Sequence, residues 1–118
     1  MKQQAGATAS ARRENSVIVS VMYQVGSGHK FDLDYYMKTH VPLVGRLWGP
    51  AGLKGAQVLQ GTGSPSGDPA MFHIIALLDF ESLDAFKAAA AAHGKEVLGD
   101  IPNFTDVQPV IQFNDRLA

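Results

Sequence analysis

Alternating apolar and polar positions predict four β-strands. The first covers Ser16–Val25, with an apolar or aromatic residue at every second position. Leu53–Gly61 is a weaker second strand because Gly55 interrupts it. Met71–Phe80 gives the strongest pattern, and Thr105–Phe113 gives the last. The first and third of these strands carry apolar residues on both faces, so we expect both faces of the sheet to be covered.

The segment Phe31–Trp48 has the spacing of a helix. Asp32 is a suitable N-cap, and Pro42 removes a backbone donor and crowds the carbonyl four residues earlier. We therefore predict a bend or a fresh helical start at His40–Pro42. Residues three and four positions apart share the inner face of this helix, and these are Leu33, Tyr36, Met37, His40 and Val44.

A second helix is predicted to begin at Ser82, which can cap it, and to end at Gly94. Residues Lys95–Leu98 can add a short helical turn. The resulting order, β-α-β-β-α-β, is typical of an α+β, ferredoxin-like fold, in which both helices cover one face of a four-stranded antiparallel sheet. The face without helices would be covered by a second copy, which predicts a homodimer that packs sheet to sheet.

Residues 1–15 are small, polar and without periodicity, so we predict a disordered N-terminal arm followed by one domain over residues 16–118. The arm has no apolar segment of the kind found in secretory signals, whereas an amphipathic transit peptide stays a weak alternative.

Composition excludes several classes of function. The net charge is −1 with both signs interspersed, which argues against nucleic acid as a partner. The chain has no cysteine, which excludes disulfides and thiolate metal sites and fits a cytoplasmic location. No apolar run is long enough to span a membrane. The histidines are scattered and no dinucleotide-binding glycine pattern occurs, so we expect neither a metal nor an organic cofactor.

Several short motifs resemble the EthD family of dimeric α+β barrel proteins. They are Met22-Tyr23, Phe31-Asp32, Tyr35-Tyr36, His40-Val41-Pro42-Leu43, Gly52-Leu53 and Phe80-Glu81-Ser82. The resemblance implies a dimeric barrel with a pocket. The family is named for ethyl tert-butyl ether degradation, in which its member accompanies an oxygenase system. Related barrels include lactone isomerases, polyketide cyclases and cofactor-free monooxygenases.

His40 is the leading catalytic candidate because imidazole exchanges protons near neutral pH, and it matches the histidine of the family motif. Its alternative role is structural, as a donor to a carbonyl freed by Pro42. Tyr36 lies one helical turn earlier and could orient the imidazole or a substrate, or it could be an ordinary core tyrosine. Tyr35 is expected to be a surface or dimer residue.

Four further residues are candidates for the wall of a substrate pocket: Met22, Trp48, His73 and Phe104. Each could equally belong to the core or, for His73, to the dimer seam. As polar groups that could converge on His40, the sequence offers Tyr36 and His73.

Together these features predict a protein that binds a small, mostly apolar organic molecule in catabolism or biosynthesis. His40 could catalyse proton transfer on that molecule, as in isomerisation, dehydration or cyclisation. Two alternatives stay open, namely a non-catalytic accessory or binding protein of an oxygenase pathway, and a cofactor-free monooxygenase.

Overall fold

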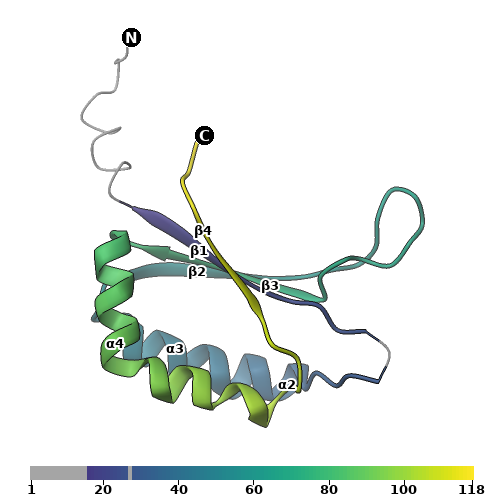
Figure 1. The fold of residues 1–118 in the computed structure, drawn as a ribbon, viewed down its shortest axis with the longest axis horizontal. Helices are drawn as coiled ribbons and strands as arrows, with labels where there is room; N and C mark the ends of the chain where they lie inside the picture. Colours follow the sequence, from purple (N-terminus) through teal and green to yellow (C-terminus); the bar gives the residue numbers. More distant parts are fainter. Residues whose placement is uncertain (1–15, 27) are drawn as a thin grey trace.

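The structure, a computed structural model, describes residues 16–26 and 28–118. The predicted arm, residues 1–15, lies outside the described residues. Strands and helices follow one another in the predicted order (Figure 1): β1 (Val17–Tyr23), α2 (Leu33–Tyr35), the π-helix η1 (Tyr36–His40), α3 (Val41–Trp48), β2 (Leu53–Gln60), β3 (Ile74–Phe80), α4 (Leu83–Gly99), the 3-10 helix η2 (Ile101–Asn103) and β4 (Val110–Asn114).

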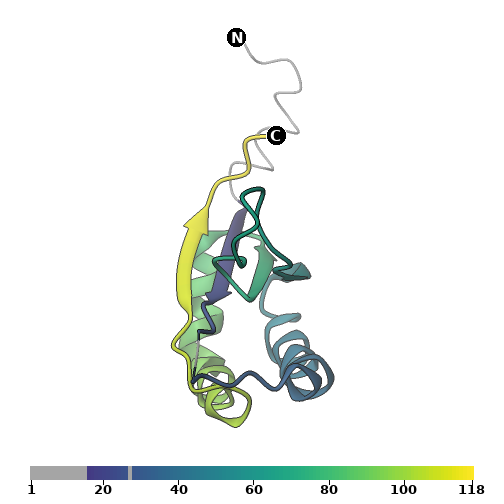
Figure 2. The ribbon, with the colours of Figure 1, turned by 90° about the vertical axis from the view of Figure 1, so that its right-hand side faces the viewer.

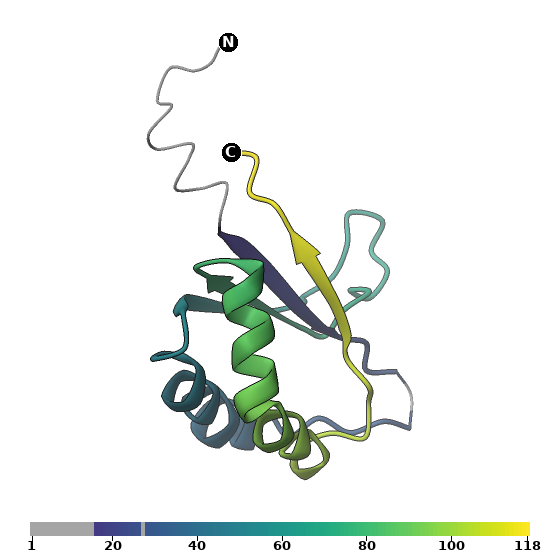
Figure 3. The ribbon, with the colours of Figure 1, turned by 60° about the vertical axis from the view of Figure 1, so that its left-hand side comes forward.

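The four strands form one antiparallel sheet in the order β2-β3-β1-β4. The two helical segments, α2–α3 and α4, lie side by side on the same face of this sheet (Figure 2). Figure 3 shows α4 crossing the sheet beside β1 and β4, while the long loop between β2 and β3 projects away from the helices. The predicted ferredoxin-like α+β fold is confirmed.

The side of the sheet that faces the helices carries the core, which falls into two groups of buried residues. We call the first the apolar cluster: Val17, Val19, Val44, Trp48, Ala76, Leu78, Phe80, Ala89 and Val97. The second is the aromatic cluster: Tyr23, Tyr36, Ile74 and Phe104. They lie toward opposite ends of β1, because Val17 pairs with Phe80 and Tyr23 pairs with Ile74.

The irregularity predicted at His40–Pro42 is a π turn within a continuous helical segment. The N–H of Val41 bonds to the carbonyl of Tyr36, five residues earlier, and this wide turn stands directly before Pro42. The extra residue in the turn shifts the phase of the helix. Met37, which was expected on the inner face, is therefore 44% exposed, and that expectation was wrong.

Helix α4 continues through Gly94, so the prediction that Gly94 ends it was wrong. Ser82 caps its first turn as predicted, accepting from the N–H of Ala85. A glycine inside a helix costs about 1 kcal/mol relative to alanine, which the burial of Val97 one turn later can offset. The helix then ends at Gly99, and Asp100, which caps it, belongs to the site described below.

Two strands begin later than expected. Strand β3 starts at Ile74 instead of Met71, and β4 starts at Val110 instead of Thr105. Pro109 has no N–H for a ladder bond, which accounts for the start of β4. Thr105 instead forms an isolated bridge with Phe31.

The other side of the sheet carries no helix, and we call it the open face. Alternation along the paired strands places six apolar side chains on it: Ile18, Met22, Leu59, Ile75, Leu77 and Val110. Within the described ranges, no helix has the length and apolar character needed to cross a membrane.

Candidate functional site

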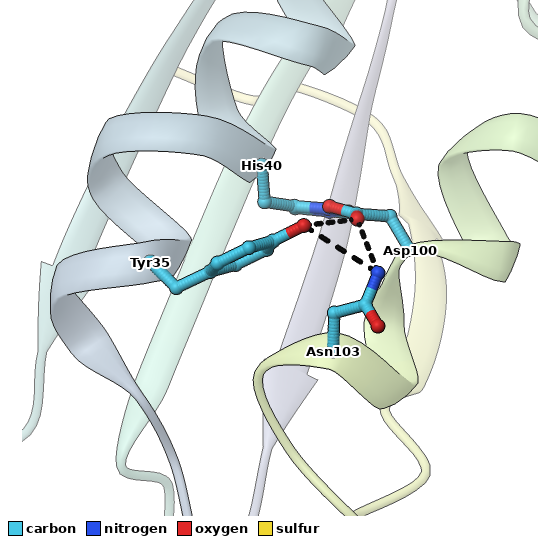
Figure 4. A network of polar contacts seen from close by, with 4 residues as sticks. All are labelled: Tyr35, His40, Asp100 and Asn103. Carbon is cyan, nitrogen blue, oxygen red and sulfur yellow. Dashed lines mark hydrogen bonds and ion pairs between the residues drawn. The ribbon is translucent and has the colours of Figure 1, made fainter.

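His40 and Asp100 form a buried pair that links the two helical segments (Figure 4). The imidazole Nδ1 lies 2.9 Å from Oδ2 of Asp100. His40 comes from the π turn, whereas Asp100 directly follows α4. Their side chains are only 6% and 11% exposed, so solvent screens this pair weakly.

Two further groups hold the carboxylate of Asp100. The hydroxyl of Tyr35 donates to Oδ1 at 2.6 Å, and Nδ2 of Asn103 donates to the same oxygen at 3.0 Å. Burial raises the pKa of Asp100, but the bonds from Tyr35, Asn103 and His40 outweigh it and leave that pKa below its ordinary value. Donation to this carboxylate raises the pKa of Tyr35. Asp100 is therefore an anion at neutral pH.

His40 is neutral near pH 7, because burial lowers its pKa and outweighs the opposing effect of Asp100. A neutral imidazole beside a carboxylate places its proton on the nitrogen that faces the carboxylate, so Nδ1–H donates to Asp100. Nε2 is then unprotonated, and no hydrogen bond engages it within residues 16–26 and 28–118. This is the arrangement of a histidine base oriented by a carboxylate.

The π turn explains why Tyr35 joins this network. With an ordinary helical turn, residues five apart point in clearly different directions, whereas a π turn closes after five residues and brings Tyr35 and His40 to one side. Tyr35 is therefore partly buried and bonded to Asp100, whereas its expected place at a dimer interface stays a prediction. Asp100 and Asn103 were missed because α4 was expected to end five residues too early, and Asp100 lies 60 residues from His40 along the chain.

A cavity of about 330 Å³ lies between the helices and the sheet. This volume is near the lower end of the range for ligand pockets, about 300–1,000 Å³. Its wall is mainly aliphatic, with valines from β1, α3 and α4, and it also includes Tyr23, Tyr36, His40 and Trp48. Lys54 is the one lysine, arginine or carboxylate side chain among the described residues that border it.

Tyr23 and Tyr36 place two phenols on this wall. They are 1% and 2% exposed, with ring centroids 6.0 Å apart, and neither hydroxyl has a hydrogen-bond partner in the described part of the chain. Burial raises the pKa of Tyr36 to about 12. Burial, and then the charge of an ionised Tyr36, raises the pKa of Tyr23 as well. Both are therefore O–H donors at neutral pH, and leaving a buried donor unpaired costs roughly 1–3 kcal/mol.

The structure brings some of the candidate residues together and separates others. The Tyr36 ring is nearly parallel to the imidazole of His40, at 5.5 Å and 22°. Phe104 packs against His40 at 4.7 Å between ring centroids but does not border the cavity. Trp48 borders the cavity and donates its indole N–H to the carbonyl of Ala89 at 3.1 Å.

Met22 and His73 do not border the cavity. Met22 lies on the open face of the sheet, since it alternates with the inward-facing Val21 and Tyr23. The ring centroid of His73 lies 5.5 Å from that of Phe31, and no hydrogen bond or ring contact in the described part of the chain joins His73 to His40. Of the four residues expected on the pocket wall, Trp48 borders the cavity, whereas Met22, His73 and Phe104 do not. For residues 16–26 and 28–118, no group of three or more His, Cys, Asp or Glu side chains could hold a metal ion.

Comparisons with known proteins agree with this architecture. The family model for the EthD domain matches residues 26–108. An EthD-like protein from Ralstonia eutropha has a TM-score of 0.82 at 35% sequence identity, over 88% of this chain and 94% of its own. An ethyl tert-butyl ether degradation (EthD) family protein from Bacillus halodurans has a TM-score of 0.62 at 18% identity, over 86% and 99% of the two chains.

A more distant structural match is SnoaB, a cofactor-independent oxygenase from Streptomyces nogalater, with a TM-score of 0.56 at 11% identity over 87% and 96% of the two chains. At that identity the match shows a shared fold. A search of the curated proteins finds no match.

Proposed function

The chain belongs to the EthD family, and on that premise we propose that it binds a small, mostly apolar organic molecule in the cavity and catalyses proton transfer on it with His40. The observation that carries the proposal is His40, which borders a mainly aliphatic cavity and pairs through Nδ1 with Asp100. A perturbed, carboxylate-oriented histidine in a concave apolar site is the expected form of a general base.

In the proposed reaction, the apolar body of the substrate packs between the sheet and the helices, which excludes water from the reacting atoms. Nε2 of His40 takes a proton from a carbon or oxygen of the substrate. The anionic Asp100 stabilises the imidazolium that forms, and the bonds from Tyr35 and Asn103 keep the carboxylate in place. Return of the proton to a different position completes an isomerisation, and its transfer to a leaving hydroxyl completes a dehydration.

Two other functions use the same cavity. A non-catalytic binding protein would hold the molecule without moving a proton. A cofactor-free oxygenase would use the base to ionise an electron-rich substrate, which then gives its electrons to oxygen, and the fold shared with SnoaB supports this alternative. One experiment can distinguish the three.

The test is a panel of small ketones, phenols and unsaturated acids incubated with the protein in D₂O, with deuterium uptake followed by NMR and oxygen consumption by an electrode. We expect deuterium uptake at carbon, reduced about 100-fold or more in His40→Gln. His93→Gln is the matched control, because His93 is a partly exposed histidine on α4 that pairs with Glu96 and does not border the cavity. Binding without exchange would identify a binding protein, and oxygen consumption would identify an oxygenase; either result rejects proton transfer as the main function.

We also propose that the protein is a cytoplasmic homodimer that packs open face to open face. The six apolar side chains of the open face support this arrangement. A stable interface buries roughly 1,200–2,000 Å² in total. Sedimentation at micromolar concentration should show a dimer, and Ile75→Lys, which puts a charge on that face, should give a monomer. A wild-type monomer would contradict this proposal.

A further inference from the structure

Among the described residues, neither Tyr23 nor Tyr36 makes a hydrogen bond to His40, yet both border its cavity. Each phenol is almost completely buried, and neither hydroxyl is bonded to a described residue. Buried hydroxyls in proteins are normally paired. By contrast, the hydroxyl of Tyr35 and the indole N–H of Trp48 both have partners within the protein. The two phenols therefore differ from Tyr35 and from Trp48 in having donors to offer to a ligand.

We infer that the hydroxyls of Tyr23 and Tyr36 together bind one oxygen atom of the ligand, and that the ligand is a small apolar ketone with a C–H bond next to its carbonyl. The inference rests on the proposed function and assigns its substrate class. A carbonyl oxygen has two lone pairs and can accept from two donors at once. The edge-to-face packing of the two rings, at 78°, holds both side chains at the same part of the wall.

The charges around the cavity favour a neutral carbonyl over a carboxylate. Among the described residues that border the cavity, Lys54 is the one permanent cation, and it is exposed on the edge strand β2. A carboxylate bound at the phenols would be a buried charge without a cation, which is strongly unfavourable. A ketone needs only the two donors that Tyr23 and Tyr36 supply, and both remain protonated because burial raises their pKa values.

The same geometry completes the proton transfer. Nε2 of His40 takes the proton from the carbon next to the carbonyl, and the electrons of that C–H bond form a carbon–carbon double bond. The π electrons of the carbonyl move onto oxygen, where the two O–H donors stabilise the developing negative charge. Return of a proton from His40 to the same carbon restores the ketone with its hydrogen exchanged. In a β,γ-unsaturated ketone, return of the proton to the far carbon of the dienolate instead moves the carbon–carbon double bond, and neither outcome requires an oxidant or reductant.

The experiment compares 2-indanone with indane, which has the same ring system without the carbonyl. Binding is measured by ligand-observed NMR with wild type, Tyr23→Phe, Tyr36→Phe and the double variant. We expect each single change to weaken 2-indanone binding about tenfold and the double change about 100-fold, with indane binding unchanged. The double variant should melt at or above the wild-type temperature, because it removes two unpaired donors and keeps the rings.

Deuterium uptake by 2-indanone in D₂O is the second readout and separates the two proposals. If the double variant binds and exchanges 2-indanone like wild type, the phenols do not bind the ligand oxygen and the inference is overturned while the proposed function stands. Equal losses for indane and 2-indanone would also overturn it, since they would mean altered packing. If His40→Gln leaves exchange unchanged while the phenol variants weaken ketone binding, the oxygen site stands and the proposed function fails.

Discussion

The two clusters of the core use their aromatic residues in different ways. In the apolar cluster, Trp48 packs edge to face against Phe80 and Phe86, and its one polar atom donates to the carbonyl of Ala89. In the aromatic cluster, Tyr23 and Tyr36 are equally buried, but no residue in the described part of the chain bonds to their hydroxyls, and the polar His40 lies against Tyr36. On the proposed function, one end of the core serves stability, and the other tolerates a cost in stability because its unpaired groups bind a ligand.

The cavity joins these two ends, so the comparison can be tested by changing one end at a time. Changes in the apolar cluster should alter the free energy of unfolding more than they alter ligand binding. Changes in the aromatic cluster and the His40–Asp100 pair should alter ligand handling by more than they alter stability.

The largest loss of stability is expected from Trp48→Ala. Removal of a buried indole leaves a void and typically costs about 3–5 kcal/mol. Urea unfolding of this variant, with Met71→Ala as the control because Met71 is 73% exposed, measures the effect. A loss below about 1 kcal/mol would show that Trp48 serves the cavity more than the core.

Asp100→Asn should have the next largest effect, about 1–3 kcal/mol, because it replaces a buried carboxylate that accepts three bonds. An amide N–H facing Nδ1 of His40 would also move the imidazole proton to Nε2 and abolish the base. Glu96→Gln is the matched control, since Glu96 pairs with His93 at 3.4 Å on the surface and should cost less than about 0.5 kcal/mol. Equal effects of the two changes would argue against a special role for the buried pair.

Stability should also depend on pH through His40. Its folded pKa lies below the ordinary value of 6.5, so the unfolded chain binds a proton first as the pH falls. The free energy of unfolding should therefore decrease as pH falls from 6.5 toward the folded pKa, and His40→Gln should remove that part of the slope. The contribution of Asp100, whose pKa is also lowered, is lost only below about pH 3.8. A slope between pH 7 and 5 that is the same in both proteins would contradict a buried, neutral His40.

The smallest effect is a gain in stability, from Gly94→Ala. A Cβ at this position would lie 4.0 Å from that of Ala90, an ordinary contact, so the helix should gain about 0.5–1 kcal/mol. Because Gly94 borders the cavity, ligand affinity should decrease. Gly99→Ala is the control, with open space around its Cβ and no place on the cavity wall. If both variants bind 2-indanone equally well, Gly94 does not limit the room available to the ligand.

The fold could be predicted from the sequence because strand alternation and the two helical patterns are local signals, and their order admits few topologies. His40 and Tyr36 were found for the same reason, being four residues apart in one helix. Tyr35 was missed because the π turn changes the helical phase, which a period of 3.6 residues does not anticipate. Asp100 was missed because Gly94 reads as a helix end, whereas tertiary packing carries α4 past it.

The central claim is that Asp100 fixes His40 as a neutral base with a free Nε2 at the cavity. The most direct test is ¹⁵N NMR of the imidazole of His40 at pH 7.5. The signals of its two ring nitrogens are assigned by their disappearance in His40→Gln. We predict the tautomer with the proton on Nδ1, an unprotonated Nε2 and a change in the Nε2 signal when 2-indanone binds. A proton on Nε2, or an imidazolium at this pH, would contradict the account.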